Sequence, residues 1–204
     1  MTGLPAPTLY SCAGSRGLRA SWAAEEAGVA LDLKMLPFPP RFECPEYLEL
    51  NPLGTVPLLV DGDSRMTESC AIAHYLAVRG GADRLVADAT LTFPQTVYLR
   101  FARFEKGKGL EEAGLAYARW FGARLAKVDE RLAAGDFLCA NRFTVADICV
   151  GYALYLARRI GLEDQLTPRL VTYLDRLIQR PGFIAALARE ENASREAGLG
   201  GAVI

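Results

Sequence analysis

The sequence predicts an α/β domain at the N-terminus followed by an all-α domain, and three features of the chain support this division. In the first part, short runs of alternating apolar and polar residues are interleaved with runs of helical periodicity. After Gly81 the segments are long and helical, without strand alternation. A polar stretch without periodicity separates the two parts. We therefore expect an α/β domain over residues 1–81, a linker over 82–90 and an all-helical bundle over 91–204.

The first domain is expected to have the element order βαβ, α, ββα. The first strand starts at Thr8, and the helix after it shows apolar residues at three- and four-residue spacing until Gly28 ends it. Alternating residues predict the second strand, and a short helix then leads to the Asn51-Pro52 turn. Asp61-Gly62 forms a hairpin turn between the last two strands. The expected strands cover residues 8–10, 31–36, 56–60 and 65–67, and the expected helices cover 16–27, 45–50 and 68–78. Strands joined by a helix lie parallel and a hairpin adds antiparallel strands, so we expect a mixed four-stranded sheet.

The second domain is expected to consist of helices separated by glycine and proline. The first of these helices extends from Leu91 to Lys106. The later helix boundaries are expected at Gly107, Gly109, Gly135, Gly161 and Pro181. The last residues, 190–204, are rich in glycine and alanine and are expected to be loosely ordered.

Charge and composition exclude several classes of function. A formal net charge of -1 gives no electrostatic reason to expect nucleic acid or an anionic membrane as a partner. No apolar run approaches the about 18 residues that span a bilayer, and the first residues lack a signal-peptide pattern. The five cysteines are scattered without a CxxC pair, and the only histidine is His74, which argues against a metal site and against a disulfide scaffold. We expect a cytoplasmic protein without a metal.

Three segments of the first domain are suited to one ligand. Ser11 to Ser15 form a small-residue loop that opens onto a helix, where free N–H groups and the helix dipole stabilise an anion such as a thiolate. A cis bond at Val56-Pro57 would turn the Val56 N–H and C=O outward, where an extended peptide can pair with them. The next helix starts at Glu68-Ser69. The Ser69 hydroxyl and the N–H groups at the helix start can hold a carboxylate, while Glu68 can hold an ammonium group. Glutathione carries a thiol, a peptide bond and an α-amino acid head in this order.

Each segment also has a purely structural explanation. A small-residue loop is typical of a tight connection, a Val-Pro pair of a strand edge, and a Glu-Ser pair of a helix cap. The order and spacing of the three segments together favour a ligand site.

Further motifs connect the chain with a known family. They are Leu9-Tyr10, Ser15-Arg16, Arg19, Glu25-Glu26-Ala27-Gly28, Pro45-Glu46-Tyr47-Leu48, Asn51-Pro52, Gly54-Thr55-Val56-Pro57, Thr67-Glu68-Ser69, Ile72-Ala73 and Tyr75-Leu76. This set resembles the thioredoxin-like domain of soluble glutathione transferases of a serine-type, bacterial-like kind. In the second domain, the stretch around Thr144 and Asp147 resembles the family's helix capping box. The resemblance implies a homodimer with one glutathione site per subunit and an open hydrophobic pocket for a second substrate.

The residue that activates the thiol is expected to be Ser15, which falls where serine-type members such as the theta and phi classes place theirs. Ser11 is the second candidate and Tyr10 the third. Since neither Ser15 nor Arg16 is a cysteine, the expected role is a hydrogen bond donated to the thiolate. Cys12 precedes the helix start, so we interpret it as a buried residue, and a disulfide reductase that uses Cys12 stays an alternative.

The resemblance implies a set of residues around glutathione. They are Thr55, Val56, Pro57, Glu68, Ser69 and Arg41. Many relatives carry a lysine just before the Val-Pro pair and a histidine before the Pro-Glu-aromatic segment, both near the glycine carboxylate. This chain has Thr55 and Phe42 there, and Arg41 is the candidate replacement for the lost cation. Without that replacement we expect weaker glutathione binding or a different ligand.

The second substrate, a small electrophile, is expected between the Ser15 loop and the helix that starts at Leu91. The candidate lining residues are Tyr98, Phe101, Phe104 and Tyr117. Aromatic residues at this spacing are also typical of a helical core.

The leading hypothesis is a glutathione transferase whose thiolate attacks a hydrophobic electrophile. Glutathione-dependent isomerisation, dehalogenation and ether cleavage are alternatives, because all begin with the same thiolate. A non-catalytic interaction module of the same fold is the alternative of a different class, and the lost cations favour it.

Overall fold

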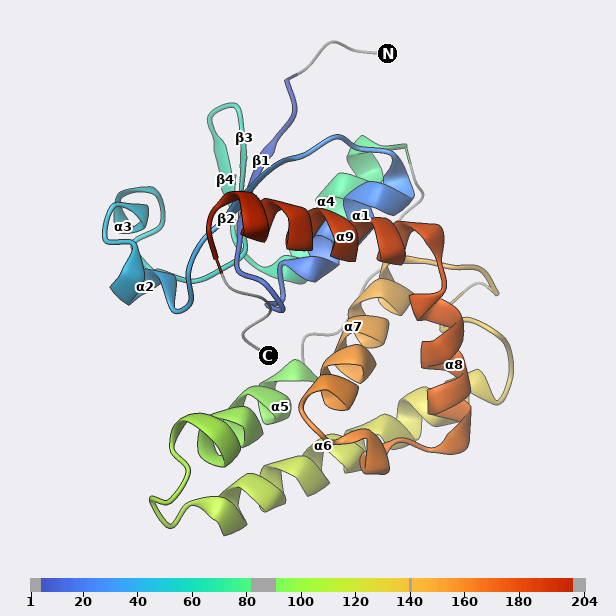
Figure 1. Cartoon of the computed structure of the whole chain (residues 1–204). Coiled ribbons are helices and arrows are strands. Elements are labelled where there is room, and N and C mark those ends of the chain that lie inside the picture. The colour runs from blue at the N-terminus through green and yellow to red at the C-terminus, as the bar shows by residue number, and fades with distance from the viewer. Residues whose placement is uncertain (1–4, 82–90, 140, 200–204) are drawn as a thin grey trace. The chain divides into compact units, whose positions relative to one another are not determined.

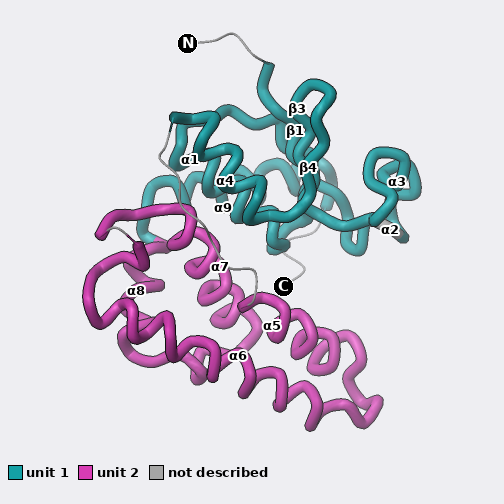
Figure 2. The backbone as a smooth tube through the Cα atoms, turned by 180° about the vertical axis from the view of Figure 1, so that it is seen from behind, with its two compact units in different colours: residues 1–84, 179–204 teal, residues 85–178 magenta. Residues whose placement is uncertain are grey.

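The computed structural model describes residues 5–81, 91–139 and 141–199, apart from the side chain of Arg41. The chain forms two compact units (Figure 2), one made of Met1–Arg84 with Gln179–Ile204 and the other of Leu85–Ile178. The linker predicted over 82–90 lies outside the described residues.

The first unit contains a mixed four-stranded sheet, as the sequence predicts, and its strand order is β2-β1-β3-β4. Its elements are β1 (Thr8–Ser11), α1 (Leu18–Ala27), β2 (Asp32–Met35), α2 (Pro40–Glu43), α3 (Tyr47–Leu50), β3 (Leu58–Asp61), β4 (Ser64–Met66) and α4 (Ser69–Arg79). β1 pairs in parallel with β2 and antiparallel with β3, which pairs antiparallel with β4. This is the arrangement of a thioredoxin-like domain.

Two helical segments depart from the expected positions. Helix α1 begins at Leu18, two residues later than the predicted Arg16, because the loop before it contains an extra turn. The short helix α2 was not predicted, since the prolines around it indicate a strand stop. Pro40 occupies the first turn of α2, where a missing N–H costs nothing.

The sheet separates two apolar cores because side chains alternate between its faces. Leu9 and Leu59 face α1 and α4, where they pack in a cluster with Ile72 and Leu76. Leu58, one residue earlier in β3, packs on the other face in a cluster with residues of the α2–α3 segment. Ser11 has the same parity as Leu9 and therefore points towards the α1 face.

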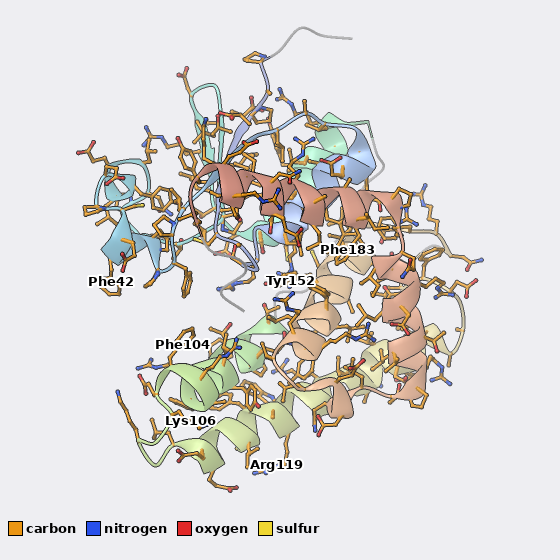
Figure 3. All side chains as sticks on the ribbon, viewed as in Figure 1. Phe42, Phe104, Lys106, Arg119, Tyr152 and Phe183 are labelled. Atoms are coloured by element: carbon orange, nitrogen blue, oxygen red, sulfur yellow. The ribbon has the colours of Figure 1, made fainter. Side chains whose placement is uncertain are left out.

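Helix α9 (Pro181–Glu196) completes the first unit and lies alongside α1 (Figure 1). Phe183, labelled in Figure 3, stacks edge-on against Trp22 of α1 with ring centroids 4.8 Å apart. Arg180 donates two hydrogen bonds of 2.7 Å to the carboxylate of Glu26. The expectation of loose order from residue 190 is wrong as far as Glu196, because the helix continues and buries Glu190.

The second unit is helical and is organised around a buried aspartate. Its described elements are α5 (Thr92–Leu99), the π-helical turn η1 (Arg100–Phe104), α6 (Glu111–Leu132), α7 (Val145–Arg159), the 3-10 turn η2 (Glu163–Gln165) and α8 (Pro168–Ile178). The predicted capping box at Thr144 and Asp147 is confirmed. The Asp147 carboxylate also accepts hydrogen bonds from the Leu138 N–H at 3.0 Å and the Tyr173 hydroxyl at 2.7 Å. Burial and this carboxylate raise the pKa of Tyr173.

Two negative findings concern the described ranges alone. No helix there has the length and apolar character needed to cross a membrane. No three His, Cys, Asp or Glu side chains there are grouped so that they could hold a metal ion.

Candidate functional site

The three segments singled out from the sequence meet at one end of the sheet in the first unit. Tyr10 in β1 is paired with Leu58 in β3, so the residues after β1 lie beside those before β3. Leu59 is paired with Met66 in β4, so the start of α4 lies at the same end. Antiparallel pairing therefore gathers the loop after Ser11, the Val56-Pro57 step and Glu68-Ser69.

The loop of residues 11–17, which we call the serine loop, is built on a tight turn. The Ser15 N–H donates to the Cys12 C=O at 3.0 Å, and Gly14 in this turn has a φ of 73°. Glycine adopts positive φ without steric cost, so the turn presents Ser15 at the mouth of α1.

Ser15 is held by two neighbours. Its Oγ accepts a hydrogen bond from the Gly17 N–H at 3.1 Å and lies 3.2 Å from the Ser11 Oγ. Gly17 has to be small, because a Cβ there would lie 1.9 Å from the Ser11 Oγ and 2.8 Å from the Ser11 Cβ. Ser11 is fully buried and cannot turn away into solvent.

The two hydroxyls can share their protons in two ways. Ser15 can donate to Ser11, which can donate onward to the Cys12 C=O at 3.4 Å. Alternatively Ser11 donates to Ser15, whose own hydrogen is then available to an outside acceptor. Because the Gly17 N–H already occupies one lone pair of Ser15, this second arrangement makes Ser15 a donor towards an incoming anion.

A buried arginine of α1 contacts the first residues of α4. Arg19 is 1% exposed, and its Nη1 lies 3.1 Å from the Ser69 Oγ and 3.3 Å from the Cys70 Sγ. Glu68 precedes the helix with a φ of 68°, an unusual conformation for a residue other than glycine, and its side chain is exposed. The pair therefore offers an exposed carboxylate beside a buried hydroxyl that an arginine orients.

The peptide bond between Val56 and Pro57 is cis, which is the isomer considered for this step in the sequence. The residue before this step is held by two side chains from the α3 segment. The Tyr47 hydroxyl donates to the Thr55 C=O at 2.7 Å, and the Asn51 Nδ2 donates to the same oxygen at 2.8 Å. These contacts set the course of the backbone that enters β3.

The other candidates for the thiol-activating position lie apart from the mouth of α1. Tyr10 packs on the opposite sheet face, with its ring 5.7 Å from that of Tyr47. Ser11 lies behind Ser15. Cys12 is buried with its Sγ 3.6 Å from the Pro37 C=O, and burial, followed by the charges of Cys44 and Glu190, raises its pKa to about 12.

The end expected to hold the glycine carboxylate is only partly described. The side chain of Arg41 lies outside the described part of the chain. Phe42 is 73% exposed on α2 (Figure 3), and Thr55 is also exposed.

The aromatic residues proposed for the second substrate belong to the helical unit. The rings of Phe101 and Tyr117 lie 6.5 Å apart, where η1 meets α6, and Gly114 of α6 faces Phe101 and Tyr98. Phe104, labelled in Figure 3, is 55% exposed at the end of η1. Phe101 and Tyr117 thus contact each other within the unit, and Phe104 faces solvent.

Sequence reasoning assigned no role in this site to Gly17, Arg19 or Asn51, although Arg19 and Asn51 belong to the motifs that resemble the family. Gly17 lies in the serine loop and Asn51 in the Asn51-Pro52 turn. Their roles depend on contacts with residues several positions away in the chain. The signal for Arg19 was a charged residue on the apolar side of an amphipathic helix, which indicates a buried partner.

Comparison with known proteins agrees with this geometry. A family model described as "Glutathione S-transferase, N-terminal domain" matches residues 15–79, and one described as "Glutathione S-transferase, C-terminal domain" matches residues 121–176. A maleylacetoacetate isomerase of Rhizobium meliloti is 33% identical over 148 residues, which cover 62% of this chain and 69% of the relative. A probable maleylacetoacetate isomerase of Vibrio cholerae is 26% identical over 195 residues, covering 81% and 91%.

A solved structure is similar over most of the chain. It is a sphingomonad glutathione S-transferase complexed with glutathione, with 27% sequence identity and a TM-score of 0.70. The match covers 90% of this chain and 98% of that one. Both family models, the relatives and the arrangement of sheet, serine loop and cis proline agree: this chain belongs to the glutathione S-transferase family.

Proposed function

We propose that this protein is a glutathione-dependent enzyme in which the Ser15 hydroxyl stabilises the glutathione thiolate. The observation that carries the proposal is the position of the Ser15 Oγ, which accepts from the Gly17 N–H and has Ser11 as its second partner. When Ser11 donates to Ser15, the Ser15 hydrogen is the group that meets a thiolate at the mouth of α1.

One hydroxyl suffices energetically. A free thiol has a pKa of about 8.5, and lowering it by two units requires about 2.7 kcal/mol of preferential stabilisation of the thiolate. A hydrogen bond to a charged group contributes about 1.5–3 kcal/mol, and the helix end adds about 0.3–1 kcal/mol. The cysteine at the base of the loop is unsuited to this role, because burial raises the pKa of Cys12 to about 12.

The rest of glutathione is assigned to the other two segments. Ser69 receives the α-carboxylate of the γ-glutamyl group, and Glu68 receives its ammonium. The backbone of Val56, held through Thr55, pairs with the cysteinyl peptide. Thr55 and Arg41 are assigned to the glycine end, where the chain lacks the cations of many relatives.

The proposed reaction is attack of the thiolate on a hydrophobic electrophile. In transfer, the new carbon–sulfur bond forms as a leaving group departs with the electron pair. The side chains proposed to line the electrophile pocket are Tyr98, Phe101, Phe104 and Tyr117.

Glutathione-dependent isomerisation is the second candidate, and the names of the two relatives favour it. The thiolate would add to an activated cis double bond, the resulting single bond would rotate, and expulsion of the thiolate would restore the double bond as trans. Glutathione is regenerated in this sequence, whereas transfer consumes it.

The proposal includes a homodimer and a cytoplasmic location. The five cysteines of the chain are all free thiols, which supports a reducing compartment.

The test compares wild type, Ser15→Ala and Cys12→Ala. Bound glutathione is titrated by the ultraviolet absorbance of its thiolate, and turnover is measured with an aryl halide and with maleylacetoacetate while glutathione consumption is followed. We expect Ser15→Ala to raise the thiol pKa by about one to two units and Cys12→Ala to leave it unchanged. If the protein binds no glutathione at millimolar concentration, the proposal that it is a glutathione-dependent enzyme is refuted. Loss of activity in Cys12→Ala alone would move the chemistry to that thiol.

A further inference from the structure

The serine loop rests on a buried carboxyl group from the last helix. Glu190 of α9 is 3% exposed, and its Oε1 accepts a hydrogen bond from the Ser21 Oγ at 3.2 Å. The Gly14 backbone N–H donates to the same carboxyl group. Gly14 is the positive-φ residue of the turn that presents Ser15. A residue far along the chain therefore contacts the backbone next to the proposed thiolate donor.

The position of this carboxyl group is set by helix packing and not by the loop. Arg189, the residue before Glu190, lies 2.7 Å from the carboxylate of Glu25 and also donates to the Leu31 C=O at 3.3 Å. Nearer the start of α9, Arg180 binds Glu26 of α1. These contacts of Arg180 and Arg189 hold α9 against α1 and the start of β2, and they place Glu190 in its buried position.

The surroundings of Glu190 favour its neutral form. Burial raises the pKa of its carboxyl group to about 8, against the hydrogen bonds from Ser21 and Gly14, which lower it. Both donors are neutral, and the described part of the chain contains no ion-pair partner for Glu190.

Charged and titratable groups on the neighbouring elements are engaged elsewhere or exposed. They are Cys12 and Arg16 in the serine loop, Arg19, Glu25 and Glu26 on α1, Asp32 and Lys34 on β2, and Arg189, Glu191, Arg195 and Glu196 on α9. Lys34 lies 3.3 Å from Asp32, and Arg19 contacts Ser69. Cys12 is close enough for the charge of Glu190 to contribute to its raised pKa.

We propose that Glu190 is a positioning residue that holds the serine loop through Gly14 as a neutral acid, and that its ionisation opposes formation of the glutathione thiolate. The catalytic half of this proposal rests on the proposed function of Ser15. Two negative charges at neighbouring buried positions disfavour each other, so the two groups titrate as a coupled pair. Activity should rise as the thiol ionises and fall again once Glu190 ionises.

The same titration affects stability, whether or not the protein binds glutathione. The carboxyl pKa rises from 4.5 to about 8 on folding. The neutral group is therefore fully accommodated below about pH 4.5, and its contribution is lost as the pH rises towards 8. Glutamine keeps an acceptor for Gly14 but cannot ionise, so it removes this pH dependence.

The experiment uses the full-length protein as wild type, Glu190→Gln, Glu190→Ala and the matched control Glu191→Gln, which changes the exposed neighbour. Amide exchange of the loop peptide is measured by mass spectrometry, and kcat, KM for glutathione and urea unfolding are followed from pH 5.5 to about 9.5. We expect Glu190→Ala to raise loop exchange and KM about tenfold with a smaller change in kcat. In Glu190→Gln, loop exchange and KM should return to the wild-type values. In this variant kcat/KM should no longer fall above about pH 8, and the free energy of unfolding should depend less on pH.

Two results would overturn the proposal. One is wild-type loop exchange in a folded Glu190→Ala protein, and the other is a falling limb that persists in Glu190→Gln. If Glu190→Ala does not fold, the pH profiles of wild type and Glu190→Gln decide alone. If glutathione does not bind, the proposed function fails, and loop exchange with the pH dependence of unfolding still decides whether Glu190 holds the loop.

Discussion

Replacing Gly17 by alanine should disrupt the serine loop from within. Gly17 has a φ of -60° and a ψ of -27°, a conformation that alanine adopts readily, so the backbone does not oppose the change. The obstacle is the added Cβ, which would lie 1.9 Å from the Ser11 Oγ and 2.8 Å from the Ser11 Cβ. Ser11 is fully buried on β1, so one of the two segments has to move.

The size of the effect follows from these contacts. On backbone entropy alone, glycine to alanine would stabilise the protein by about 0.4–1 kcal/mol. Overpacking in a tight interior costs about 1–3 kcal/mol, so we expect a net loss of up to about 2.5 kcal/mol in the free energy of unfolding. Movement of Gly17 also displaces Ser15, and kcat/KM should fall roughly tenfold or more.

The assay is a double-mutant cycle with Ser11→Gly, which removes both colliding atoms. Urea unfolding is measured for wild type, both single variants and the double variant, with Gly114→Ala as the matched control. At Gly114 the added Cβ would be 3.4 Å from its nearest neighbour, the Phe101 Cβ, so this helical substitution should not destabilise. We expect a coupling energy of about 1–3 kcal/mol between positions 11 and 17. Equal costs of Gly17→Ala in both backgrounds would refute the steric argument.

Three further predictions concern other contacts. Asn51→Ala removes one of two donors to the Thr55 C=O and should raise the glutathione KM several-fold with kcat nearly unchanged; an equal loss in kcat would contradict a binding role. Arg180→Met should lower the free energy of unfolding in urea by about 1–3 kcal/mol, because the Glu26 carboxylate then keeps its hydrogen bond from the Trp22 indole but loses both bonds from Arg180. The control is Arg119→Met, which removes the exposed ion pair with Glu112 and should lower that free energy by no more than about 0.5 kcal/mol. Since the pKa of Cys12 is raised to about 12, the folded protein at pH 8 should resist iodoacetamide at this residue, and peptide mapping that finds Cys12 alkylated before unfolding would show the thiol to be accessible.

Much of the fold and part of the candidate site could be predicted from local patterns in the sequence. Period-two alternation around Leu9 and Leu59 predicts strands with one buried face, and the structure packs these residues against α1 and α4. The capping box at Thr144 is confirmed, and it could be predicted because it depends on only a few neighbouring residues. The sequence also led us to expect three loop segments at one edge of a mixed sheet, and the observed strand pairing brings them to one end of it.

Contacts between distant segments were not readable in the same way. The sequence shows a serine at position 15 and a glycine at 17, but the collision that requires the glycine involves Ser11 of the preceding strand. Arg19 and Ser69 meet only after the sheet brings α1 beside α4. The composition of the residues near the C-terminus led us to expect loose order there. In the structure α9 packs on α1, and Glu190 becomes one of the most buried carboxyl groups of the unit.

The sequence by itself therefore determined most of the elements, their order along the chain and which segments carry the serine, the Val-Pro pair and the Glu-Ser pair. Periodicity, turns and caps are local, so a few adjacent residues suffice to specify them. Tertiary structure alone decided how Ser15 is oriented and that Glu190 lies against Gly14. Those features depend on side chains that are remote in the chain and on the loss of water around them, and neither is encoded in a local pattern.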